Sequence, residues 1–260
     1  PVTRRLFTTA DDFGDTPAVN EAVVDAYRHG VLRFASLMVL RPAAAAAAAA
    51  AKEKPGLGVR LHLELCSTSP ELAGLRYFAD LRARAGLEGE IRAQLDALLA
   101  LGVQPTHIDG HMNVHVHPVV FPAVCRIARE YGVGRVRLPR GEWEDLKSFP
   151  GGLNVESALL AGVFEGMGAW VEAAARGLAV PRACGALRSG LMSEEYVVWL
   201  LSRMSEGDTE LYFHPTTDPA LRAGPRPTRS HQSVTELETL RSPRVRRALD
   251  EYGVELVSAR

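Results

Sequence analysis

The sequence has few cysteines and no cysteine pair. Its three cysteines, Cys66, Cys125 and Cys184, are an odd number, lie far apart and form no Cys-x-x-Cys motif. Disulfide-stabilised small domains and thiolate zinc sites both need closely spaced cysteines. The pattern therefore argues against both classes and predicts reduced thiols in a cytoplasmic protein.

The chain also lacks an excess of charge and a long apolar run. With 30 Lys and Arg against 31 Asp and Glu, the formal net charge is −1, which gives no reason to expect binding to nucleic acid. No stretch approaches the roughly 18 apolar residues of a membrane span, and Pro1 begins no signal-peptide pattern. We therefore expect a soluble, intracellular protein.

What the chain has is enough apolar residues for a large core. It contains 260 residues, of which 47% are hydrophobic, enough for one α/β barrel or two small domains. Short apolar runs alternate with helical patterns, as in a mostly parallel sheet. Because no linker separates these elements, residues 1–260 are predicted to form a single (β/α) barrel-like domain. The predicted strands are Arg5–Thr9, Phe34–Leu40, Gly58–Leu65, Thr106–Asp109, Arg135–Leu138, Glu210–Phe213 and Val254–Val257.

One low-complexity segment, Ala43–Ala51, is a run of alanines ended by Pro55 and Gly56. Alanine has the highest helix propensity and makes no side-chain demand, so the run predicts a helix. We assign it no function.

An acidic pair, Asp11 and Asp12, follows the first predicted strand. Thr16 and Pro17 then begin a helix as its cap and first residue. Adjacent carboxylates at a strand end can divide two tasks, since one can bind a cation while the other exchanges protons. The alternative is a solvated turn, which is commoner for an isolated pair. The pair lies in the motif Thr9-Ala10-Asp11-Asp12-Phe13-Gly14.

Histidines are concentrated in residues 105–118. Pro105, Gly110 and Pro118 favour strand and loop over helix there, although the histidine spacing also fits one helical face. The segment would place imidazoles and a carboxylate at the end of a strand, whereas the alternative is a surface stretch without function. It carries four of the chain's eight histidines, His107, His111, His115 and His117, together with Asp109.

Two further histidines, His62 and His214, lie in or directly after apolar strands. A histidine in such a strand is more often a hydrogen-bonded core residue than a ligand. Here the predicted topology places both at the carboxyl ends of strands, beside Asp12 and His111. That is the functional end of α/β barrels.

These motifs together resemble the YdjC-like family of carbohydrate deacetylases, and most closely its hopanoid-biosynthesis-associated group. The resemblance extends along nearly the whole chain, and it implies a distorted seven-stranded barrel of the polysaccharide-deacetylase type. The motifs that carry it are Thr9-Ala10-Asp11-Asp12-Phe13-Gly14, Leu61-His62-Leu63, His107-x-Asp109-Gly110-His111, His115-x-His117-Pro118, Arg137-Leu138-Pro139-Arg140 and Phe213-His214-Pro215. The narrower likeness lies in Ala35-Ser36-Leu37-Met38, residues 189–196 and Tyr212-Phe213-His214-Pro215.

The resemblance implies one divalent metal ion bound by Asp12, His62 and His111, with Asp11 as the catalytic base. Two imidazoles and one carboxylate suit zinc, with magnesium, cobalt and nickel as alternatives. The chain departs from the family pattern at Asn113, where many members carry a histidine, and at Arg60, where a small or apolar residue is usual. If Arg60 points inward, it could contact a substrate oxygen.

The remaining roles follow from the chemistry of amide hydrolysis, which needs an acid for the departing amine. His214 is the candidate for that acid, and Arg137 could pair with Asp11. Since metal-bound imidazoles usually need an orienting acceptor, three residues are candidates for such support or for substrate contact. These are His107, Asp109 and His115.

The expected substrate is an N-acetylglucosamine unit, most specifically one attached to a hopanoid lipid. The lipid expectation rests on the narrower likeness and on Leu153–Trp170, a segment that is apolar at helical spacing. This segment is either an ordinary packed helix or an apolar flap for peripheral contact with the inner face of the membrane. The alternatives are a deacetylase of soluble chitooligosaccharides such as diacetylchitobiose, a phosphatase, and a non-catalytic sugar-binding protein.

Overall fold

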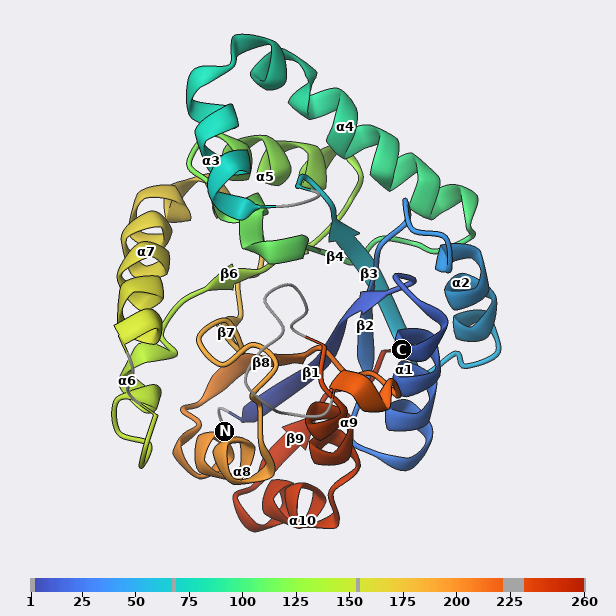
Figure 1. Ribbon diagram of the computed structural model, residues 1–260, viewed down its shortest axis with the longest axis vertical. Helices are drawn as coiled ribbons and strands as arrows, with labels where there is room; N and C mark the ends of the chain where they lie inside the picture. Colours follow the sequence, from blue (N-terminus) through green and yellow to red (C-terminus); the bar gives the residue numbers. More distant parts are fainter. Residues whose placement is uncertain (1–2, 67–68, 153–154, 222–231, 260) are drawn as a thin grey trace.

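Parallel strands form a nearly closed barrel in this computed structural model (Figure 1). The structure describes residues 3–66, 69–152, 155–221 and 232–259. Eight strands follow one another in the order β5-β4-β3-β2-β1-β8-β7-β6, and β9 pairs with β1 outside this path. Their bounds are β1 Arg4–Phe13, β2 Phe34–Leu37, β3 Gly58–Leu63, β4 His107–Gly110, β5 Arg135–Val136, β6 Leu138–Pro139, β7 Arg182–Cys184, β8 Gly207–Phe213 and β9 Val254–Leu256.

Helices surround the barrel, and several begin at the signals expected from the sequence. The Thr16 side chain caps α1, and Pro17 is its first residue. The alanine run forms α2 as predicted. The helices are α1 Pro17–His29, α2 Ala44–Lys52, α3 Pro70–Ala79, α4 Leu81–Ala100, α5 Val120–Glu130, α6 Trp143–Leu146, α7 Val155–Val171, α8 Glu194–Arg203, α9 Val234–Arg241 and α10 Pro243–Glu251, with 3₁₀ helices η1 His111–Val116, η2 Glu172–Ala175 and η3 Pro219–Leu221.

The predicted barrel is confirmed, but its path has eight strands where seven were expected, and several strands differ from the prediction. The sequence reading missed β7, because three residues led by an arginine make too short a pattern to recognise. The predicted strand Arg135–Leu138 is divided at Arg137 into β5 and β6. The last predicted strand became β9, which lies outside the barrel path.

Strand β1 is longer than predicted and contains both aspartates. It continues through Asp11 and Asp12 to Phe13, where we expected a turn. Asp12 has a φ of 61°, and the pairing with β2 shifts register between Ala10 and Phe13. This irregularity changes the alternation of side chains at the acidic pair.

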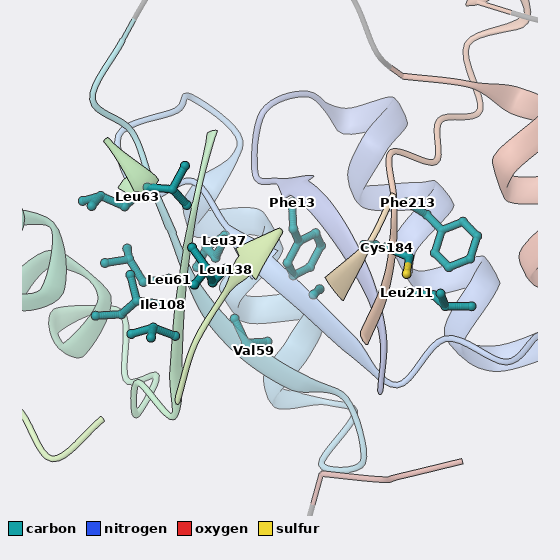
Figure 2. Packing of buried hydrophobic residues seen from close by; sticks show 14 of the residues in the cluster. Phe13, Leu37, Val59, Leu61, Leu63, Ile108, Leu138, Cys184, Leu211 and Phe213 are labelled. Atoms are coloured by element: carbon teal, nitrogen blue, oxygen red, sulfur yellow. The ribbon is translucent and has the colours of Figure 1, made fainter. Parts of the chain in front are cut away.

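The two faces of the strands differ in chemistry. Leu61, Leu63, Ile108, Leu211 and Phe213 are buried in the apolar core (Figure 2). The residues that alternate with them are polar and meet one another across the barrel interior, since strand side chains point to opposite faces in turn. They include Arg60, His62, His107, Asp109 and Glu210.

Helix α7 has an apolar outer face. Val155, Leu159, Val163 and Trp170 are exposed by 76%, 69%, 52% and 76%, respectively. The stretch Ser157–Ala175 is long and apolar enough to span a membrane by length and composition alone, and 22% of its most apolar window is buried. The expectation that no stretch approaches the length of a membrane span overlooked this one, in which two glutamates interrupt the apolar residues. Leu153, which began the expected apolar segment, lies outside the described residues.

Candidate active site and metal centre

Asp12, His62 and His111 meet at the carboxyl ends of the strands. The Asp12 carboxylate lies 3.0 Å from Nδ1 of His111 and 3.4 Å from Nε2 of His62. Asp12 and His62 are buried, whereas the His111 side chain is 24% exposed and opens the cluster toward solvent. Their three potential ligand atoms lie within 4.8 Å of one another, which suits a single cation.

Asp109 orients His62 toward the cluster. Its Oδ1 lies 2.6 Å from Nδ1 of His62, and its Oδ2 accepts a 2.5 Å hydrogen bond from the Ser36 hydroxyl. With Nδ1 engaged, Nε2 of His62 faces Asp12, as a metal-binding imidazole requires. Burial alone would lower the pKa of His62, but Asp11, Asp109 and Asp12 together raise it to about 10. The cluster therefore strongly favours positive charge.

Asp11 is held by Arg137, which is fully buried. Nη1 of Arg137 donates to Oδ2 of Asp11 over 2.6 Å, and Nη2 donates to Oδ1 over 2.9 Å. Such a two-point contact fixes the plane of the carboxylate as well as its position. The pairing expected from the sequence is therefore present, and it leaves Asp12 to the two imidazoles.

A residue that the sequence reading missed, Glu210, lies beneath this pair. It is completely buried and accepts hydrogen bonds from Arg60 (2.6 Å), Arg137 (3.0 Å) and the Thr9 hydroxyl (2.7 Å). Burial opposes its ionisation, but Arg137 and Arg60 outweigh burial and lower the pKa of Glu210. The sequence pattern could have revealed it, because residues two apart in a strand share one face, which places Glu210 on the same face as His214.

Three other candidates have no direct contact with the ligand cluster. Arg60 is 2% exposed and packs 4.1 Å from the Phe34 ring centroid, so the structure gives no support for its expected contact with a substrate oxygen. His107 is equally buried, and burial lowers its pKa to about 3. His115 lies with Nε2 2.9 Å from the Arg137 carbonyl oxygen. Arg60 donates to Glu210, and Nε2 of His107 lies 3.8 Å from the same carboxylate, so both lie next to Glu210 rather than next to the ligand cluster.

His214 follows β8 and lies near both Asp11 and Ser189. Its Nε2 is 3.9 Å from Oδ2 of Asp11, and its Nδ1 is 3.3 Å from the Ser189 hydroxyl. Burial would lower the pKa of His214, but Glu236, whose carboxylate lies 3.8 Å from Nδ1, outweighs burial and raises it. Glu236 comes from α9, and no motif in the sequence pointed to it.

Similar proteins of known fold agree with the barrel. A protein of Enterococcus faecalis V583 named for cellobiose-phosphate cleavage superposes with a TM-score of 0.72 at 21% identity, over 99% of this chain and 98% of that one. A lactam utilization protein from Thermus thermophilus gives a TM-score of 0.51 at 17% identity, over 96% of this chain and 98% of that one. At these identities the likeness concerns the fold alone.

Sequence relatives carry the name carbohydrate deacetylase. One from Brevibacillus brevis is 40% identical over 148 residues, which are 52% of this chain and 59% of the relative. Another from Geobacillus stearothermophilus is 38% identical over 49% of this chain and 57% of the relative. These matches thus span less than two thirds of the relatives' length. The family model of the YdjC-like protein matches residues 5–251, and this chain therefore belongs to the YdjC-like family.

Proposed function

We propose that the protein is a metal-dependent hydrolase that removes the N-acetyl group from an N-acetylglucosamine unit. The observation that carries the proposal is the cluster of Asp12, His62 and His111 beside Asp11, an aspartate already fixed by Arg137. The named carbohydrate deacetylases among its relatives support the reaction class.

The donor set fits one divalent cation, with zinc as our assignment. Asp12, His62 and His111 would hold it, and Asp109 would keep the imidazole of His62 aligned. When bound, zinc supplies Lewis acidity toward the amide carbonyl and the attacking water. The strongly raised pKa of His62 fits this assignment, because a cation can replace the proton that the surrounding carboxylates attract.

Asp11 and His214 are the proposed proton carriers. Asp11 accepts the proton of the attacking water, since Arg137 turns its carboxylate into a fixed acceptor. His214 protonates the departing amine, and its raised pKa favours the acid form. The 3.9 Å between Nε2 of His214 and Asp11 allows both groups to reach one bound amide.

The rival functions fit the site less well. A phosphatase needs free cationic side chains around the phosphate, but Arg60 and Arg137 are buried and paired with carboxylates. A non-catalytic sugar-binding protein has no need of a fixed carboxylate beside a candidate metal site. This chain retains both features.

For the substrate we propose a glycosylated hopanoid, handled by a cytoplasmic protein that touches the membrane only peripherally. The support is the narrower likeness in the sequence and the apolar outer face of α7, which can rest on a lipid surface. A deacetylase of soluble chitooligosaccharides is the alternative.

The test compares acetate release from an N-acetylglucosaminyl hopanoid and from diacetylchitobiose, with metal content measured on the same protein. We expect a higher kcat/KM on the lipid. If the soluble disaccharide is the better substrate, the lipid assignment is wrong and the deacetylase assignment stands. If neither releases acetate from fully metal-loaded protein, the deacetylase assignment fails for this substrate class.

A further inference from the structure

Tyr212 lies inside the barrel, next to the proposed base. It is 1% exposed, and the Arg137 guanidinium packs 4.0 Å from the centroid of its ring. On another side the ring meets Gly185, where an added Cβ would lie 3.1 Å from Cγ of Tyr212 and 2.5 Å from its carbonyl oxygen. Gly185, with a φ of 135°, thus permits an approach that no other residue allows. The ring is held in one place.

Among the described residues no acceptor takes the proton of the Tyr212 hydroxyl, although the Asn113 side chain lies close enough to act on the phenol oxygen. Burial raises the pKa of Tyr212 well above its ordinary value, so the phenol remains a neutral donor at working pH. A buried hydroxyl without a partner destabilises the fold, and proteins generally pair or hydrate such groups. Its presence beside a catalytic pair therefore suggests that the partner is a ligand.

Asn113 presents a second unpaired atom. Its side-chain carbonyl oxygen is buried without a partner among the described residues, whereas its amide NH₂ lies near the Tyr212 phenol oxygen and opposes the rise in the pKa of Tyr212. Met112 and Asn113 both have a φ of 54°, two consecutive left-handed residues directly after His111. Asparagine tolerates this conformation better than methionine does. Strain of this kind is typical of functional turns.

We propose that Tyr212 and Asn113 together bind one ring hydroxyl of the acetylated sugar. A hydroxyl both accepts and donates, so it can take the phenol proton of Tyr212 and give its own to Oδ1 of Asn113. A charged group is a poorer fit, because the nearest charges, Asp11 and Arg137, already satisfy each other. This inference rests on the proposed function and adds which side chains select the sugar.

The test crosses enzyme variants with substrate analogues. The best N-acetylglucosaminide substrate and each of its single-deoxy analogues are assayed with wild type, Tyr212→Phe and Asn113→Ala. We expect wild type to disfavour one analogue by roughly 10- to 100-fold in kcat/KM, and each variant to lose a similar factor on the parent sugar only. The Tyr212→Phe protein should also have at least the Tm of wild type, because it loses an unpaired buried hydroxyl.

Tyr196→Phe is the matched control. Tyr196 is equally buried, but its hydroxyl donates to Glu142 over 3.2 Å, so its removal should lower Tm without changing the preference between parent and deoxy sugars. The inference is overturned if Tyr212→Phe reduces kcat/KM equally on all analogues, or if wild type accepts every deoxy sugar as well as the parent. Either result leaves the proposed function intact, whereas wild type that releases no acetate from any sugar contradicts the proposed function itself.

Discussion

Asp11 and Asp12 are adjacent, yet they meet different partners inside the same barrel. In a regular strand, consecutive side chains point to opposite faces. The positive φ of Asp12 interrupts that alternation, so Asp11 reaches Arg137 while Asp12 reaches His62 and His111. An aspartate in this conformation costs about 1 kcal/mol. That cost is consistent with a functional constraint on the backbone at this residue.

Asp11→Asn tests the division of tasks within the pair. The amide keeps the shape of the carboxylate but cannot accept a proton, so kcat should fall by roughly 10²- to 10⁴-fold. Metal content should remain that of wild type, because Asp12 and both imidazoles are unchanged. Near-normal turnover by metal-loaded Asp11→Asn would show that another group is the base.

The ligand set is tested by removing one imidazole at a time. His62→Ala and His111→Ala should each bind far less metal, because the two ligands that remain compete poorly with water. His29→Ala is the matched control, since His29 is exposed and pairs only with Asp25 among the described residues. Elemental analysis after equal exposure to zinc measures the difference. Full occupancy in His111→Ala would remove that residue from the ligand set.

At the scale of the elements, β3, β4 and β8 fill the barrel with charge. Arg60, His107 and Glu210 form a layer beneath Arg137 and Asp109, and all are buried. Barrel interiors of this size are normally filled by side chains, but mostly apolar ones. Buried charges persist only where each finds a partner, and here Glu210 is the partner common to both arginines.

Glu210→Ala should therefore destabilise the fold strongly. It leaves Arg60 without its close carboxylate and weakens the support of Arg137, and breaking a buried pair on one side costs about 3–5 kcal/mol. Glu206→Ala, an exposed glutamate that precedes the same strand, should change stability by no more than about 0.5 kcal/mol. Denaturant unfolding of both variants measures the contrast. Equal stability of the two would show that the layer does not depend on Glu210.

Because His107 on β4 is buried, we also expect the free energy of unfolding to depend on pH. His107 has its pKa lowered from 6.5 to about 3 in the folded protein, mainly by burial. Between these values the unfolded chain takes up a proton that the folded chain refuses, so stability falls as pH drops below about 6.5. His107→Asn removes this uptake. Between pH 7 and pH 5 the free energy of unfolding of this variant should fall by about 2 kcal/mol less than that of wild type, as measured by denaturant unfolding. An equal fall in both proteins would contradict the lowered pKa of His107.

The sequence predicted those elements whose signals are local. Thr16 and Pro17 mark the start of α1, the alanine run predicts α2, and apolar residues alternate with Arg60 and His62 in the strand that became β3. The charge layer was not predictable in full, because the contact between Arg60 and Glu210 joins residues 150 positions apart. Glu236 likewise reaches the backbone of His214 only after α9 has packed against the barrel. Such partners depend on the closed barrel rather than on any motif.

In the molecule as a whole, the candidate ligands, the buried charge pairs and the apolar face of α7 lie in different regions of the fold. The candidate ligands and Asp11 lie at the carboxyl ends of the strands, and the paired charges lie beneath them. The exposed apolar side chains belong to α7, which lies at the periphery of the barrel (Figure 1). Functional groups at the carboxyl end of a parallel barrel are the rule for this architecture.

The most direct test of the account is acetate release from an N-acetylglucosaminyl substrate before chelation, after chelation, and after zinc is returned. We predict that turnover is lost with the metal and restored by about one equivalent of zinc per chain, and that His62→Ala is not restored under the same conditions. Acetate release that continues at the original rate in metal-free protein would contradict the account.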